Sequence, residues 1–315
     1  MTASRSSGHT HQPSDGSNAV SLERRWSRFW FAPAEVGPLA MIRIGTAAVA
    51  LLSWWSYGPD LQAWFGPDGM ISPAVLEAWR SPYGVSLFDA ATTAASLWAL
   101  YAAGAAVLAC LLVGLGTPLA AVMAAIFFAS LLHRGPMLAG SADDCLVVML
   151  WCLAVGRSGD AISLDALLRR RLGREEPGPS VRNRLSLSLL RVHASWIAAA
   201  AVLSQIKGDV WWDGTAAWWL IAAREQPPRS LASAMLASEY FTNALTHAAL
   251  LFEIVFAAGV WVAPLRGPLV AVGLVAWPAI GWLAGEPAWG AAMAVMGLAW
   301  APPGWFARLS GRSTS

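Results

Sequence analysis

Apolar residues run through this chain in long blocks separated by short polar segments. Eight blocks extend over about 17–22 residues, the length that a helix needs to cross the hydrocarbon core of a bilayer. They cover residues 37–56, 94–114, 117–133, 138–156, 189–207, 243–263, 268–284 and 287–302. We therefore predict an all-α, polytopic integral membrane bundle of about eight transmembrane helices. Gly285-Glu286-Pro287 is expected to form a tight turn between the last two.

The ends of the chain predict tails around this membrane domain. Residues 1–21 are rich in Ser, Gly, His and Pro and lack an apolar core, which is typical of a disordered tail rather than a signal peptide. Arginines then interleave with Trp26 and Phe29, which indicates an amphipathic segment at the membrane interface. The membrane domain is predicted at 22–305, and a second tail at 306–315.

Arginine positions predict the orientation. They are concentrated in the N-terminal tail, in the 157–191 loop, at Arg266 and near the C-terminus. With eight spans, all these segments fall on one side, which the positive-inside rule assigns to the cytoplasm. We expect a multi-pass protein of the bacterial inner (plasma) membrane with both termini in the cytoplasm. The long segments 57–93 and 208–242 then lie on the outer side.

Polar residues also predict where short helices begin between the spans. Ser163 has the residue type of a helix N-cap, and Asp165 would follow in the first turn. Thr215 occupies an N-cap position after Asp213-Gly214. The segments that contain them are therefore expected to form short helices at the membrane interfaces.

Composition supports the membrane assignment. Hydrophobic residues make up 57% of the chain and charged residues 13%, whereas soluble domains carry about 25% charged residues. The 19 tryptophans suit a protein with many membrane interfaces. A net charge of +2 gives no reason to expect a nucleic-acid partner, so the lipid bilayer is the expected partner. We predict no metal site, because the cysteines lack metal-ligand spacing.

Lys207 is the sharpest candidate for chemistry, because it is the only lysine among 21 lysines and arginines. Its stripe on a helical wheel holds His193, Trp196, Ala200, Ser204 and Lys207 within about 80°. Such a stripe is expected to face protein rather than lipid. A lysine can release its proton, whereas an arginine in practice cannot. Lys207 is therefore a candidate base; the alternative is an interfacial cation that snorkels beside Trp211 and Trp212.

The sixth apolar run carries a second polar stripe. Asn243, Thr246, His247, Leu250 and Glu253 fall within about 120° of one another. Glu253 lies about halfway through the bilayer, where an ionised carboxylate is costly, so it needs a partner or stays protonated. We predict that Glu253 and His247 belong to a functional site. The alternative is a hydrogen bond between helices that fixes their packing.

Further charged residues lie in the first and fourth runs. Asp143 and Asp144 point about 100° apart on a helix, and Arg134 is a candidate partner for one of them. A helix N-terminus that favours negative charge is the alternative explanation. Arg43 is expected either to snorkel to the cytoplasm or to pair inside the bundle, and Gly45 would permit close helix approach.

Five segments carry a family resemblance. They are Met41-Ile42-Arg43-Ile44-Gly45, the Trp64–Ile71 loop, Ser163-Leu164-Asp165, Leu203-Ser204-Gln205-Ile206-Lys207 and Trp211-Trp212-Asp213-Gly214-Thr215. Together they resemble the horizontally transferred transmembrane domain family, which includes the vitamin K-dependent γ-carboxylases. The resemblance covers about residues 22–305, and its most specific part is a lysine followed closely by a Trp-x-x-Gly turn.

The carboxylase resemblance implies a mechanism. Lys207 would deprotonate a reduced naphthoquinone, menaquinol or vitamin K, whose reaction with oxygen yields a strong base. That base would remove the γ-proton of a glutamate, and CO₂ would add to the carbanion. Lys207 would have to be buried beside Trp211 and Trp212 to act as a base near neutral pH. The candidate cofactor contacts are Trp211, Trp212, Asp144 and Arg43.

The chain also departs from the carboxylases. Asp143 or Asp144 stands where they carry a histidine in the fourth span, and Trp277 stands at another histidine position in the seventh. They also have a large peptide-binding domain after the membrane part, whereas about a dozen residues follow the last predicted span here. This disfavours a processive peptide carboxylase and leaves open a smaller relative that uses a quinone or a lipid, and a separate soluble partner in place of the missing domain.

Three function classes remain open from the sequence. The first is a quinol-dependent, carboxylase-like lyase or oxidoreductase with Lys207 as base. The second is a non-catalytic membrane protein that binds a lipid, a quinone or a partner protein. The third is a transporter, which the absence of an inverted repeat and of paired broken helices disfavours.

Overall fold

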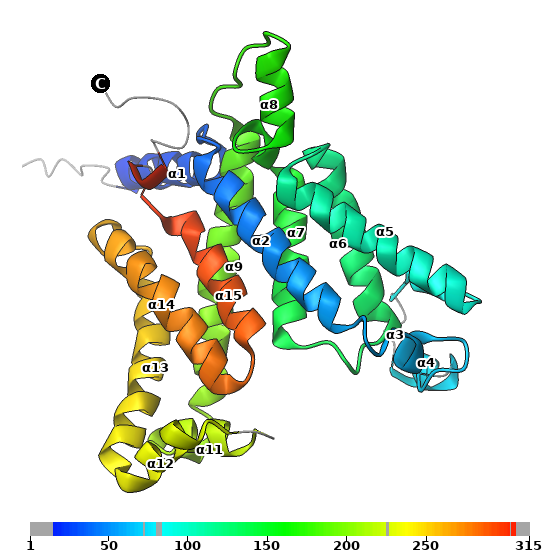
Figure 1. The fold of residues 1–315 in the computed structure, drawn as a ribbon. Coiled ribbons are helices and arrows are strands. Elements are labelled where there is room, and N and C mark those ends of the chain that lie inside the picture. Colours follow the sequence, from blue (N-terminus) through cyan, green and yellow to red (C-terminus); the bar gives the residue numbers. More distant parts are fainter. Residues whose placement is uncertain (1–14, 72, 80–83, 225–226, 303, 307–315) are drawn as a thin grey trace, which may run out of the picture.

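A computed structural model describes residues 15–71, 73–79, 84–224, 227–302 and 304–306 (Figure 1). The long helices are α1 (Asp15–Phe31), α2 (Gly37–Ser56), α5 (Ala94–Val113), α6 (Thr117–Arg134), α7 (Ser141–Val155), α9 (Val181–Gln205), α13 (Glu239–Gly259), α14 (Arg266–Ala284) and α15 (Pro287–Gly297). The shorter ones are α3 (Leu61–Phe65), α4 (Pro73–Trp79), α8 (Leu164–Arg171), α10 (Asp209–Trp212), α11 (Ala216–Ala222), α12 (Arg229–Ala237), η1 (Leu87–Ala90), η2 (Ser158–Asp160), η3 (Ala263–Leu265) and η4 (Leu298–Trp300). Most of the predicted N-terminal tail (1–14) and most of the predicted C-terminal tail (307–315) lie outside the described residues.

The structure confirms a helical bundle suited to a membrane. Within the described residues, six helical segments are long and apolar enough to span a bilayer: α2, α5, α6, α9, α13 and η3 joined to α14. The fourth and eighth predicted spans are also helical. However, α7 has 15 residues and α15 has 11, which is short of the roughly 20 residues of a typical span. The count of eight spans and their orientation therefore stay predictions.

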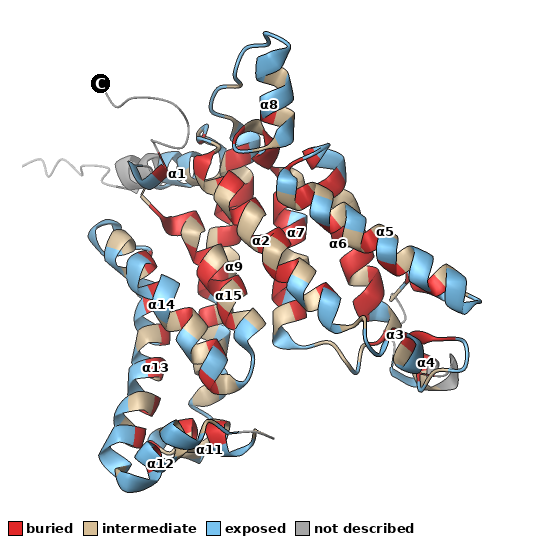
Figure 2. Cartoon of the chain, in the orientation of Figure 1, coloured by how far each residue is buried: buried red, intermediate tan, exposed pale blue. Residues whose placement is uncertain are grey.

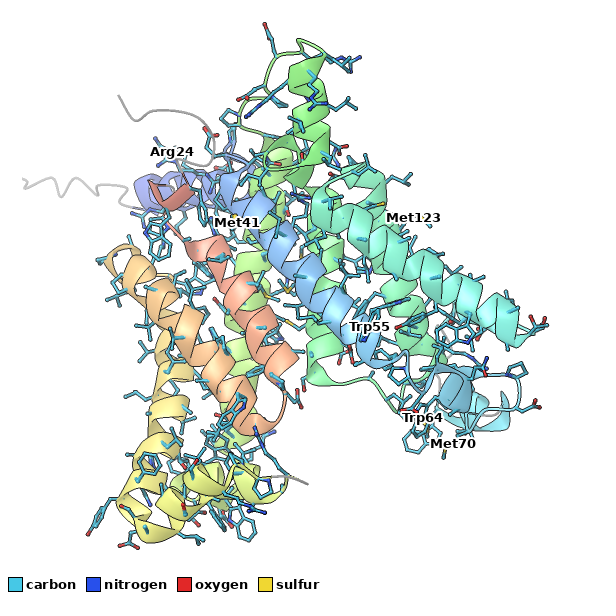
Figure 3. The ribbon with its side chains drawn as sticks, in the orientation of Figure 1. Arg24, Met41, Trp55, Trp64, Met70 and Met123 are labelled. Carbon is cyan, nitrogen blue, oxygen red and sulfur yellow. The ribbon has the colours of Figure 1, made fainter. Side chains whose placement is uncertain are left out.

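The short elements gather at two opposite ends of the bundle (Figure 1). One end, called here the α8 end, holds α1, α8 and the start of α2. The opposite end, called the α11 end, holds α3, α4, α11 and α12. Trp64 and Met70 of the predicted turn lie beyond the end of α2 (Figure 3). The Met70 and Ile71 amides close this turn onto α3.

Buried residues concentrate in the middle of the bundle, along α2, α7, α9 and α15 (Figure 2). By contrast, 22% of the most apolar stretch of α13 is buried inside the bundle, and 28% of that of α14. The corresponding share for α2 is 50%. Glycines permit the closest contacts: a Cβ at Gly45 would lie 2.6 Å from a Val295 methyl group, which confirms the expected close approach of a helix at this position. Gly285, at φ +82°, forms the predicted turn before α15.

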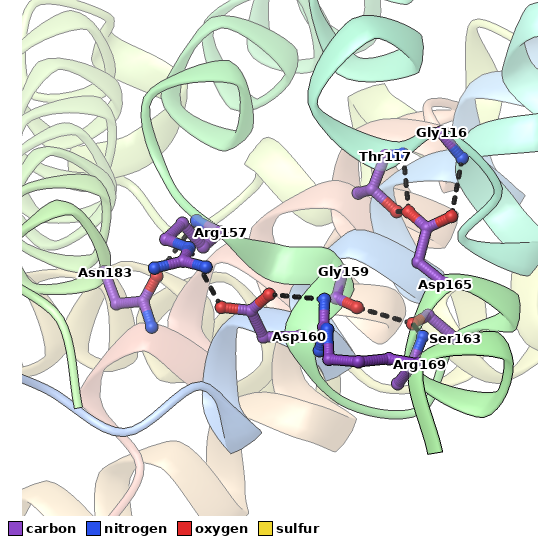
Figure 4. A network of polar contacts seen from close by, with 10 residues as sticks. Gly116, Thr117, Arg157, Gly159, Asp160, Ser163, Asp165, Arg169 and Asn183 are labelled. Carbon is purple, nitrogen blue, oxygen red and sulfur yellow. Dashed lines mark hydrogen bonds and ion pairs between the residues drawn. The ribbon is translucent and has the colours of Figure 1, made fainter. Parts of the chain in front are cut away.

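A polar network fastens the α8 end (Figure 4). Ser163 caps α8 as predicted, because its Oγ accepts the Ala166 amide at 2.9 Å. Asp165 does something that the sequence does not predict. Its carboxylate accepts the Gly116 and Thr117 amides and the Thr117 hydroxyl, each at 2.8 Å, and so caps the start of α6. This cap joins two helices that are far apart in the sequence.

Asp165 should make the free energy of unfolding depend on pH in the acid range. Burial alone would raise the pKa of Asp165, but hydrogen bonds from Thr117 and Gly116 and the charge of Arg169 lower it below its usual range. Its contribution is therefore present above the unfolded-state pKa of about 3.9 and is lost as the pH falls through the folded-state value. We expect Asp165→Asn to lower the free energy of unfolding by about 1 kcal/mol at neutral pH, as loss of a helix cap usually does.

Thermal unfolding of the wild type and of Asp165→Asn, followed by tryptophan fluorescence in detergent, measures this effect. The gap between the two melting temperatures should narrow as the pH is lowered into the acid range. A gap of constant size would mean that the carboxylate charge contributes nothing.

Candidate functional site

The predicted site residues fall into two groups. Arg43 and Asp144 lie on α2 and α7, whereas Lys207, Trp211 and Trp212 follow α9, and Glu253 and His247 lie on α13. α13 packs against both α9 and α14. The structure thus places the last five predicted residues in one region and leaves the first two in another.

The Arg43 guanidinium group donates hydrogen bonds to backbone carbonyl groups. It is fully buried, and its Nη1 donates to the carbonyl groups of Leu111 at 2.8 Å and Leu112 at 3.2 Å. Its Nη2 donates to the Ile162 carbonyl group. Of the two predicted alternatives, the guanidinium therefore takes partners inside the bundle. These bonds use Nη1 and Nη2, whereas Nε is buried without a hydrogen-bond partner among the described residues.

The two neighbouring aspartates differ in burial. Asp143 is buried and accepts hydrogen bonds from the Ser53 and Tyr57 hydroxyl groups, both at 2.8 Å. Burial raises the pKa of Tyr57, and the Asp143 carboxylate raises it further, so this phenol remains a donor. Asp144 is exposed. Arg134 donates to the Phe65 carbonyl group at 3.3 Å.

The Lys207 stripe does not face the protein, and this prediction was wrong. α9 ends at Gln205, and Lys207 lies exposed in the turn that follows. Trp196 is 69% exposed on the same side of α9. Serine and alanine form much of the covered side instead, and the Ser186 and Ser188 hydroxyl groups donate to backbone carbonyl groups of neighbouring segments. Lys207 therefore lacks the burial that the carboxylase mechanism requires.

The Trp211–Thr215 motif is a turn that docks on α13. Asp213 accepts the Thr215 amide and hydroxyl group at 3.0 and 2.6 Å, so Thr215 takes the predicted N-cap position of α11 without capping it by its own side chain. Gly214 has φ +77°, and a Cβ there would lie 2.0 Å from the Asn243 side chain. These contacts explain the residue types at Asp213 and Gly214 by local geometry.

Thr246 of α13 receives this turn. Its Oγ1 lies 2.9 Å from the Gly214 carbonyl oxygen, to which it donates, and accepts the Ala217 amide at 3.0 Å. Trp212 is 69% exposed, and its indole donates to the Ile206 carbonyl group. The segment that carries the two candidate tryptophans is thus held against α13 at the α11 end.

Glu253 is a fully buried acidic residue in the middle of α13. Its side chain is fully buried within α13, and among the described residues no donor meets either carboxyl oxygen at hydrogen-bond distance and angle. The Gln205 side chain approaches this carboxyl, but its own Oε1 also lacks a hydrogen bond. Because Gln205 is the last residue of α9, Glu253 lies close to the turn that carries Lys207.

Aromatic residues lie directly before Glu253 and one turn after it on α13. Phe252 and Phe256 both contact the Trp277 ring edge-on, with centroids 5.2 Å apart in each pair. Trp277 is fully buried, and its Nε1 donor has no acceptor. Trp277 was noted in the sequence only as a departure from the carboxylases, and Gln205 only as part of a motif. No local signal marks Gln205 as a neighbour of Glu253, or Trp277 as a neighbour of Phe252 and Phe256, because these contacts join different helices.

His247 does not share the burial of Glu253. It is exposed, and its Nδ1 lies 2.9 Å from the Asn243 carbonyl oxygen one turn earlier. The predicted polar stripe of α13 therefore splits: Thr246 and Glu253 face the protein, and His247 faces outward.

Comparison with protein-family models, with curated proteins and with solved structures gives no match for this chain.

Proposed function

We propose that this chain is a multi-pass membrane protein that binds a quinol-type lipid beside Glu253, between α9, α13 and α14. One observation carries the proposal: a fully buried carboxyl group in a span-length helix, which the Gln205 side chain approaches but which no described residue bonds at full hydrogen-bond geometry. Ionisable groups at this depth are costly and by default mark functional sites. A structural acid would be expected to have found a donor in the protein.

The neighbouring groups fit a reduced naphthoquinone. Such a ligand presents two hydroxyl groups on a flat aromatic ring. Glu253 offers acceptor oxygens, and the Trp277 Nε1 offers a donor that has no acceptor. Phe252 and Phe256, close to Glu253 in the sequence, pack edge-on against Trp277. When bound, the quinol would supply two electrons and two protons; Glu253 would accept and hold one of those protons.

Lys207 has a second part in the proposal. The family resemblance makes it the base, and its exposed position in the turn after Gln205 favours a more modest role. There it would exchange protons between the buried acid and water at the membrane surface. The exposure of Lys207 also favours the alternative function, a quinone- or lipid-binding protein without catalysis.

Menaquinone binding tests the proposal. Protein purified from cells that make menaquinone is extracted with solvent, and bound quinone is quantified per mole of protein. We expect the wild type to retain menaquinone and Glu253→Gln to bind it about tenfold more weakly, since a charge-assisted hydrogen bond contributes about 1.5–3 kcal/mol. Matched variant His247→Gln, on the exposed side of the same helix, should bind as the wild type does.

Two outcomes separate the alternatives. Oxidation of added menaquinol by dissolved oxygen, catalysed by the wild type and lost in Lys207→Arg with unchanged binding, would favour the enzyme. Binding without oxidation in both proteins would favour the non-catalytic function. Equal quinone content in Glu253→Gln and the wild type would contradict the site itself.

A further inference from the structure

An apolar groove of about 360 Å³ opens between α12, α13 and α14. Its walls are formed by Leu231, Phe241, Leu245, Ala248, Ala249, Phe252, Ala276, Ala279, Ile280, Trp282 and Leu283. The volume lies within the range of small-molecule sites, about 300–1,000 Å³. Glu253 is not among the walls, and Phe252 alone is shared with the proposed quinol site, so the groove borders that site without including the buried acid.

The position of the groove limits what can occupy it. Most of its walls belong to α13 and α14, which are long and apolar enough to span a membrane. In a bilayer the medium around these helices is acyl chain. At Leu283 the groove borders a small buried cluster that also contains Met235 of α12 and Ile221 of α11. An occupant therefore enters from the lipid and ends against α11 and α12.

The guanidinium group of Arg224 lies beside this groove. Arg224 follows α11 directly, and its guanidinium carbon lies 4.8 Å from the centroid of the Trp282 ring, which lines the groove. Its Nε is buried and has no hydrogen-bond acceptor among the described residues. None of the ion pairs among the described residues involves Arg224. A guanidinium group matches the geometry of a phosphate and binds it through two parallel hydrogen bonds.

We infer that the groove and Arg224 form a binding site for one anionic phospholipid. An acyl chain lies along the walls from α13 and α14, and the phosphate group lies against Arg224. The aromatic ring of Trp282 joins the two parts, since it contacts the chain on the groove side and stacks with the guanidinium group. The charge of Arg224 makes the site prefer an anionic headgroup to a zwitterionic one.

Competitive lipid retention tests this inference. The full-length protein is exchanged into mixed micelles that contain equal amounts of phosphatidylglycerol and phosphatidylcholine, washed with detergent, and analysed by native mass spectrometry. The wild type should retain one phosphatidylglycerol. Arg224→Gln should reduce the preference for phosphatidylglycerol about fivefold, the size expected for one arginine near an anionic headgroup. Arg229→Gln, an exposed arginine at the start of α12, is the matched control and should keep the preference.

A second variant tests the acyl-chain part. Ala279→Phe places a ring in the groove and should reduce retention of both lipids, whereas Ala271→Phe, exposed on α14 away from the groove walls, should not. If Ala279→Phe does not fold, Ala248→Leu on the opposite wall replaces it. The inference is overturned if Arg224→Gln keeps the wild-type preference, if the wild type retains both lipids equally, or if filling the groove leaves retention unchanged.

Discussion

Replacing Arg43 with methionine is expected to lower the free energy of unfolding by about 2–6 kcal/mol, because it leaves buried carbonyl groups, those of Leu112 and Ile162 above all, without their guanidinium donor. The guanidinium group is fully buried and donates to the carbonyl groups of Leu111 and Leu112. Those carbonyl groups belong to the last turn of α5, where helix donors run out; the Gly114 amide also reaches the Leu111 carbonyl group, at 3.2 Å. The same side chain bonds the Ile162 carbonyl group, so it ties α2 and α5 to the segment before α8.

Methionine fills much of the same space but offers no donor. Each buried carbonyl group left without a hydrogen bond costs about 1–3 kcal/mol. Unfolding in mixed micelles with increasing dodecyl sulfate measures the change. Arg170→Met is the matched control, because Arg170 makes an exposed ion pair with Glu176 and its loss should cost under about 1 kcal/mol. Wild-type stability in Arg43→Met would mean that other donors replace the guanidinium group.

Features that depend on neighbouring residues could be predicted from the sequence. The Ser163 cap, the turn at Gly285 and the close approach at Gly45 all follow from the residue itself and its immediate flanks. The helical nature of all eight apolar runs follows for the same reason, since a hydrophobic run of this length must satisfy its backbone hydrogen bonds internally.

Features that depend on distant partners could not be predicted. Arg43 and Ile162 are 119 residues apart in the chain, and nothing near either residue indicates the contact. The same limit explains the error on α9. A helical wheel shows which residues share a side of a helix, but other helices decide which side is covered. On α9 the covered side carries Ser186 and Ser188, whose hydroxyl groups bond backbone carbonyl groups, so polarity alone did not distinguish the two sides.

The candidate site was predicted in part. The depth of Glu253 in its apolar run correctly indicated a buried acid, because that inference needs only its position along the helix. His247 shares the wheel sector but lies about two turns away, where α13 is more open to its surroundings. Gln205 and Trp277 come from α9 and α14, and their proximity to this part of α13 is a property of the folded bundle.

Glu253→Met should separate function from stability. A buried polar group without a hydrogen bond costs about 1–3 kcal/mol, and methionine has a similar length without that penalty. We therefore expect Glu253→Met to raise the free energy of unfolding by about 2 kcal/mol while it abolishes menaquinone retention. Ile254→Met, on the exposed side of the same helix, should change neither quantity.

The sign of this stability change decides what Glu253 is for. A group kept for packing contributes to stability, so its removal should destabilise the bundle, as the hydrogen-bond alternative requires. A group kept for binding or proton transfer remains despite its cost, because natural proteins tolerate such strain at functional sites. A more stable but ligand-free Glu253→Met protein is the result that only the second role explains. A less stable one would instead mean that Glu253 bonds Gln205 or another donor across the helix interface.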